Sequence, residues 1–82
     1  MENSYVFGKE FRKYELLVLH EVLFKICIML ERAGAIDMDD YWDFGVFPIE
    51  IDRPKREHEK AVALLAHKLK SFFEEKTIKG SS

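Results

Sequence analysis

Cysteine, proline and glycine are scarce in this chain of 82 residues. The single cysteine, Cys27, rules out an intrachain disulfide and is typical of a reducing compartment. We interpret it as a small apolar residue within a helix. Neither proline nor glycine occurs in residues 11–30, and this absence favours a helix there.

Signals for export and for membrane insertion are also lacking. The chain starts with the polar segment 1–4, and no apolar stretch of a signal peptide follows it. In the most apolar segment, residues 11–30, the polar residues His20, Glu21 and Lys25 interrupt the pattern. We therefore expect a soluble cytoplasmic protein.

The common motifs of metal, cofactor and catalytic sites are missing as well. Asp37-x-Asp39 resembles the start of a calcium loop, but Trp42 stands where that loop needs glycine. The three histidines have no zinc-ligand spacing, so structural or solvated roles are expected for them. No nucleophile elbow or phosphate-binding loop is present. We predict no metal, no cofactor and no catalytic residues.

What the chain does contain is a dense apolar segment, residues 11–30, which we predict to lie in a helix of about residues 9–33. Gly34 is the expected stop. At 100° per residue the apolar side chains form two stripes. The wide arc holds Phe11, Val18, Leu19, Val22, Leu23, Ile26, Met29 and Leu30, with Leu16 and Cys27 at its edge. The narrow stripe holds Leu17, Phe24 and Ile28.

A second helix is predicted over about residues 53–76, with Asp52 as its N-cap and Pro54 in its first turn. The intervening segment is predicted to contain a helical turn over 38–43 that Gly45 ends. Residues 46–51 are predicted to be extended, but Pro48 restricts them to an edge strand. Residues 5–7 are a candidate partner for that strand.

The resulting fold prediction is mainly α, with two antiparallel helices joined by an acidic linker. Residues 1–79 form one small domain and residues 80–82 a flexible tail. Because two helices make a thin core, we predict a homodimer that completes a four-helix arrangement. The predicted dimer contacts are Leu17, Phe24, Ile28 and Leu64. The alternative is that the rest of the chain wraps the first helix on both sides.

Negative charge is concentrated in residues 37–52, which carry six acidic side chains and no basic one. Since the whole chain has a formal charge of −2, the remainder carries −2 − (−6) = +4. Aromatic residues are interleaved with these acids, as at many protein interfaces. The predicted partner-binding residues are Asp39, Asp40, Tyr41, Trp42, Asp43 and Phe47. The alternative is that the aromatic residues close the end of the core while the aspartates face water.

The leading hypothesis is a small non-enzymatic protein that binds a basic partner through this segment, such as an inhibitor, an immunity protein, an antitoxin or a phage-encoded modulator. A nuclease, a toxin or a nucleic-acid-binding protein would be a suitable partner. The second hypothesis is a dimeric structural subunit or adaptor. The third is a small nucleic-acid-associated regulator, which the acidic pI of 5.9 disfavours.

Overall fold

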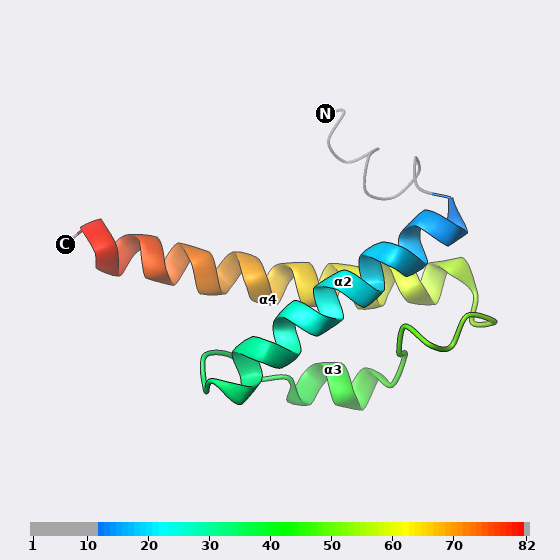
Figure 1. Ribbon diagram of the computed structural model, residues 1–82, viewed down its shortest axis with the longest axis horizontal. Helices are drawn as coiled ribbons and strands as arrows, with labels where there is room; N and C mark the ends of the chain where they lie inside the picture. The colour runs from blue at the N-terminus through cyan, green and yellow to red at the C-terminus, as the bar shows by residue number, and fades with distance from the viewer. Residues whose placement is uncertain (1–11, 82) are drawn as a thin grey trace.

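The computed structural model describes residues 12–81 of the chain, and the side chains of residues 12–75. Three helices form the described part: α2 (Lys13–Arg32), α3 (Asp39–Phe44) and α4 (Lys55–Ser81). Figure 1 shows α2 crossing α4, with the short α3 beside them. The protein is therefore mainly helical, as predicted. The pairing of residues 5–7 with a strand lies outside the described residues.

The two long helices run in the same general direction, which makes the prediction of an antiparallel pair wrong. His20 contacts His58, and Cys27, about two turns further along α2, contacts Leu65, which lies about two turns further along α4. In Figure 1 both helices advance from the right of the view toward the left. The reason is the length of the connection: residues 33–54 are enough to carry the chain back to the start of the first helix.

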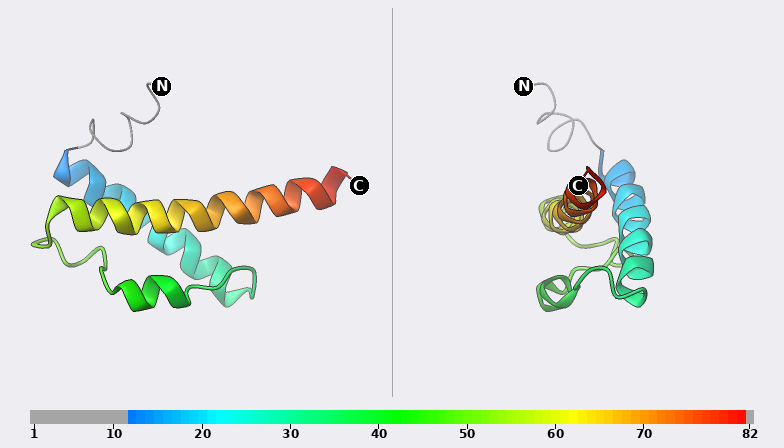
Figure 2. Two further views of the ribbon diagram at one scale, coloured as in Figure 1. Left: turned by 180° about the vertical axis from the view of Figure 1, so that it is seen from behind. Right: turned by 90° about the vertical axis from the view of Figure 1, so that its left-hand side faces the viewer.

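The connection returns through α3, which lies below α4 and at the level of the C-terminal end of α2 (Figure 2). The core lies where the three helices and the loop after α3 meet. Its buried members are Cys27, Met38, Tyr41, Val46, Ala61, Leu65 and Leu69. The acidic linker thus supplies three core side chains and is part of the packed structure.

The buried face of α2 differs from the predicted one. Leu16, His20 and Cys27 are buried, whereas Val18 and Val22, placed in the predicted arc, are about half exposed. Periodicity alone could not choose between the faces, because apolar residues occupy two sides of this helix. The packing of α3 and α4 decides which side is covered.

Glycines end α2 and α3 as predicted. Gly34 has φ +76°, its N–H donates to the Glu31 carbonyl, and the Ala35 N–H donates to the Leu30 carbonyl. These two bonds form a Schellman motif, which satisfies carbonyls left free at the helix end. Gly45 also has φ +76° and follows the last turn of α3.

Two other predictions differ from the structure. Residues 46–51 form turns and no strand, since the Glu50 N–H donates to the Phe47 carbonyl and the Ile51 N–H to the Ile49 carbonyl. The second long helix begins at Lys55, two residues later than predicted, and continues to Ser81, beyond the predicted end at residue 76. Within the described residues, no helix has the length and apolar character needed to cross a membrane.

Candidate functional site

A chain of buried hydrogen bonds connects the acidic segment to both long helices. Tyr41 Oη lies 2.8 Å from His20 Nε2, and His20 Nδ1 lies 2.8 Å from His58 Nδ1. His58 Nε2 lies 2.8 Å from the backbone oxygen of Glu50. The Tyr41, His20 and His58 side chains are all fully buried. This continuous series of hydrogen bonds therefore connects α3 and the loop after it to α2 and α4.

The donor and the acceptor of each hydrogen bond can be assigned by starting from the Glu50 carbonyl. A carbonyl oxygen can only accept, so His58 Nε2 donates to Glu50. With both rings neutral, His58 Nδ1 then accepts from His20 Nδ1, and His20 Nε2 accepts from the Tyr41 hydroxyl. Each polar atom of the three side chains has a partner, and this fixes both histidine tautomers.

The surroundings disfavour a charge on His20 and on Tyr41. Burial, and then the proximity of His58, lower the pKa of His20 from 6.5 to about 4. Burial also raises the pKa of Tyr41 above its ordinary value. Since all four ring nitrogens of His20 and His58 are engaged in hydrogen bonds, this histidine pair is a structural support and offers no free metal ligand.

Lys68 of α4 makes a second polar connection, to the start of α3. Its Nζ donates to the Asp37 backbone oxygen at 2.6 Å and pairs with Asp40 Oδ1 at 2.5 Å. The Lys68 side chain is 13% exposed, so this ion pair is partly shielded from water. The hydrogen bond from Lys68 lowers the pKa of Asp40.

An aromatic cluster holds Trp42 at the surface. The indole lies 5.9 Å from the Phe47 ring, 6.0 Å from the Phe24 ring and 5.5 Å from the Tyr41 ring, measured between centroids. Its Nε1 donates to Glu31 at 3.3 Å. Trp42 remains 37% exposed, so its outer part is presented to solvent on a fixed support.

The acidic groups around Trp42 fall into two classes. Asp40 is paired with Lys68, and Glu50 pairs with Arg53 and accepts the Phe47 N–H. Asp39 and Asp43 are exposed, and neither side chain forms an ion pair within the described part of the chain. The exposed side chains Asp39, Trp42, Asp43 and Phe44 define what we call the acidic aromatic surface.

Four of the six predicted partner-binding residues are exposed: Asp39, Asp40, Trp42 and Asp43. Of these four, Asp40 has its carboxylate paired with Lys68. Phe47 is half-buried behind Trp42. The Tyr41 side chain is buried, so assigning it to a contact surface was wrong. The alternative reading, that aromatic residues close the core, is correct for Tyr41.

The four predicted dimer contacts are half-buried. Phe24, Ile28 and Leu64 pack against the core of their own chain. The physical reason is that α3 and its flanking segments supply the cover that was expected from a second molecule. These three residues therefore have an intrachain packing role.

The histidine pair was missed because each histidine was read as a single polar residue. A signal was present, since His20 stands four residues after Leu16 and seven before Cys27, on the side of the helix that is buried. His58 likewise stands three and seven residues before Ala61 and Leu65. A polar residue at core spacing on two helices indicates a buried hydrogen bond between them.

A shallow groove lies between α4 and the connection from α2 to α3. Its volume of about 260 Å³ is below the range of roughly 300–1,000 Å³ that is typical of small-molecule sites. It is lined by Ala35, Ile36, Asp37, His67, Lys68, Ser71, Phe72 and Glu75. The groove does not indicate a cofactor site.

Comparison with known proteins gives a family. The family model described as uncharacterised protein family UPF0058 matches residues 11–82. The chain belongs to the UPF0058 family. A UPF0058 protein of Archaeoglobus fulgidus is 34% identical over 67 residues, a match that covers 79% of this chain and 72% of the relative. No solved structure gives a significant match. The match to the UPF0058 model includes all three helices and the acidic aromatic surface.

Proposed function

We propose that this protein is a non-enzymatic binding module of the inhibitor or antitoxin type. It docks its acidic aromatic surface on a basic surface of another protein. The observation that carries the proposal is the fixed position of Trp42 in the same short helix as two unpaired carboxylates, those of Asp39 and Asp43. A rigid, partly exposed tryptophan loses little conformational entropy on binding and is a frequent hot spot.

Electrostatics supports a basic partner. The six acidic residues of the segment 37–52 include two, Asp40 and Glu50, that basic side chains of the same chain already neutralise. Asp39 and Asp43 retain their charge on the surface, beside Trp42 and Phe44. Complementary charge speeds encounter and rejects acidic competitors, while the aromatic groups supply contact area.

The buried hydrogen bonds of Tyr41, His20 and His58 support the same proposal, because they keep the acidic aromatic surface ordered. Tyr41 precedes Trp42 in α3, and its hydroxyl is fixed through His20 to α2. Glu50 fixes the far end of the loop through His58. A surface that is ordered before binding needs less ordering on contact, which increases affinity.

The test is capture of partners from lysate of the source cells, followed by titration of the purified partner. The double variant Trp42→Ala/Asp43→Ala should lose a high-pI partner that the wild type retains. The matched control is Phe73→Ala/Glu74→Ala, which also removes an exposed aromatic ring and an adjacent carboxylate, but from α4. This control should bind as the wild type does. Equal binding by both variants would reject the proposal.

A further inference from the structure

The outer face of α2 carries a stripe of exposed apolar side chains. Val18, Val22, Ile26 and Met29 are 50%, 47%, 39% and 68% exposed. Their spacings of four, four and three residues place them along one side of the helix. We call these four residues the outer α2 stripe. Single exposed apolar residues are ordinary, but a continuous row of them indicates an interaction surface.

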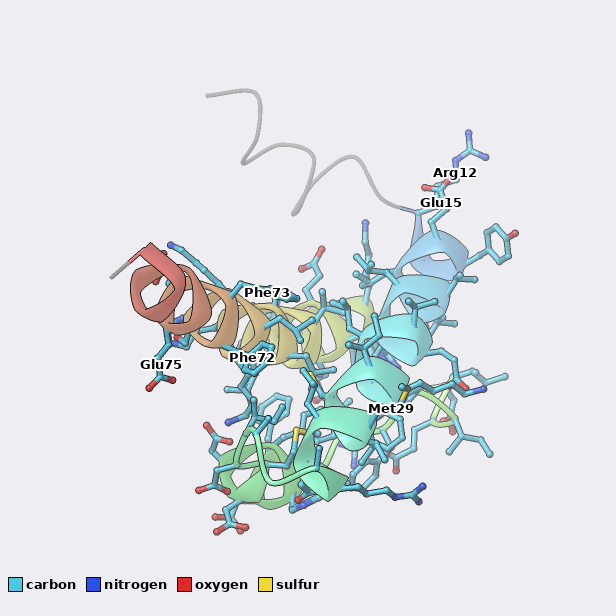
Figure 3. The ribbon with its side chains drawn as sticks, turned by 60° about the vertical axis from the view of Figure 1, so that its left-hand side comes forward. Arg12, Glu15, Met29, Phe72, Phe73 and Glu75 are labelled. Atoms are coloured by element: carbon cyan, nitrogen blue, oxygen red, sulfur yellow. The ribbon has the colours of Figure 1, made fainter. Side chains whose placement is uncertain are left out.

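The described part of the chain leaves this stripe uncovered. Leu16, His20 and Cys27 mark the opposite side of α2, which is buried against α4. Figure 2 shows α2 at one edge of the molecule, with α3 and α4 both on its other side. In Figure 3 Met29 lies on the side of α2 that faces away from α4. The stripe therefore does not serve the core described above.

We infer that the outer α2 stripe binds the same stripe of a second copy of this chain, with the two helices antiparallel and Val22 at the two-fold axis. Such an isologous contact needs a self-complementary surface. The stripe has this property, because Val18 and Ile26 stand four residues before and after Val22. Val22 then meets Val22, and each Val18 meets Ile26 of the other copy.

Charge complementarity favours the antiparallel orientation. Glu21 and Lys25 lie on the same flank of the stripe, where they already form an i,i+4 pair at 3.3 Å. In an antiparallel pair this flank faces its own copy, so each Glu21 comes within one turn of Lys25 of the second copy. The result is a cluster of four alternating charges. A parallel two-fold pair would place this flank opposite the other flank of the second copy, so the cluster of four charges would not form.

The ends of the helix fit the same orientation. Tyr14 is 72% exposed at the start of α2, and Arg32 is exposed at its end, on the same flank. Antiparallel packing brings the Tyr14 ring within one turn of the Arg32 guanidinium of the second copy, where a cation–π contact can form. The small size of the chain adds a general reason, since domains of this length are often stabilised by association.

The first test measures mass by light scattering from low micromolar to submillimolar concentration. The wild type should approach twice its mass of 9.7 kDa. Val22→Glu should raise the dissociation constant about a hundredfold or more, because two like charges would meet at the axis. Ile49→Glu is the matched control, since Ile49 is an exposed apolar residue of the loop and its substitution should leave the dimer unchanged.

The second test determines the orientation by disulfide formation between introduced cysteines. Val22→Cys should cross-link to itself, whereas Val18→Cys should cross-link to Ile26→Cys and not to itself. Cys27 is buried and stays out of this reaction. A monomeric wild type, whether its stripe is bare or covered by residues 1–11, would overturn the inference. A dimer that tolerates Val22→Glu, or homotypic cross-linking at residue 18, would also overturn it.

Discussion

At the scale of single residues, the most consequential side chains are His20, His58 and Tyr41. They are fully buried and polar, so the hydrogen bonds among them determine whether their burial is tolerated. The sequence shows that these residues exist but not that they meet, because 38 residues separate the two histidines and 21 separate His20 from Tyr41. Their mutual contact depends on the parallel arrangement of the long helices.

Tyr41→Phe should destabilise the protein by about 1–3 kcal/mol. The change keeps the ring volume but removes the only donor to His20 Nε2, leaving a buried acceptor unsatisfied. Chemical denaturation followed by circular dichroism measures the effect. Tyr14→Phe is the matched control and should change stability by less than about 0.5 kcal/mol, because Tyr14 is exposed. Equal effects of the two substitutions would contradict the proposed role of the hydroxyl.

Stability should fall as the pH is lowered from about 6.5 to about 4. Folding lowers the pKa of His20 from 6.5 to about 4, so within this window the unfolded chain binds a proton that the folded chain does not. Above the window the stabilisation is fully present. The total loss is about 3 kcal/mol, since one pKa unit corresponds to about 1.4 kcal/mol.

Urea denaturation at a series of pH values measures this loss. His20→Gln should reduce the pH dependence within the window, whereas His67→Asn, on the exposed side of α4, should retain it. The lowered pKa of Asp40 acts in the same direction but below its ordinary value of 3.8, so its contribution appears at more acidic pH. A midpoint that stays constant from pH 6.5 to 4 would refute the assignment to His20.

At the scale of elements, local signals were sufficient for the helices and insufficient for their arrangement. Gly34 and Gly45 marked two helix ends because each requires a positive φ. The direction of α4 relative to α2 is not a local property, since it depends on how residues 33–54 return across the molecule. For the same reason the buried face of α2 could not be chosen from a helix that is apolar on two sides.

Gly34→Ala should destabilise the protein by about 1 kcal/mol, or several degrees in melting temperature for a domain of this size. The cost comes from the backbone alone, because an added Cβ would have no atom within 4 Å while φ is +76°. Gly34→Asn should cost less, since asparagine adopts this conformation more readily. Thermal unfolding compares the two variants. An Asn variant as unstable as the Ala variant would point to a cause other than the positive φ.

At the scale of the whole molecule, the candidate surface was partly predictable. Counting the charged residues along the sequence located it, because a segment with six acidic residues and no basic one is acidic whatever the fold. It could not tell which of these acids remain unpaired, since Lys68 reaches Asp40 from a helix 28 residues away in the sequence. Nor could it show that Tyr41 points inward while its neighbour Trp42 points outward.

The hydrogen-bonded chain from Tyr41 to Glu50 also bears on how the molecule folds. If α2 and α4 docked without α3, the His20–His58 pair would be buried with both outer nitrogens lacking partners. An intermediate in which only the two long helices are packed together is thereby disfavoured. The acidic segment and the helix pair are consequently expected to form and melt in a single cooperative transition, so that the acidic aromatic surface is either fully assembled or absent.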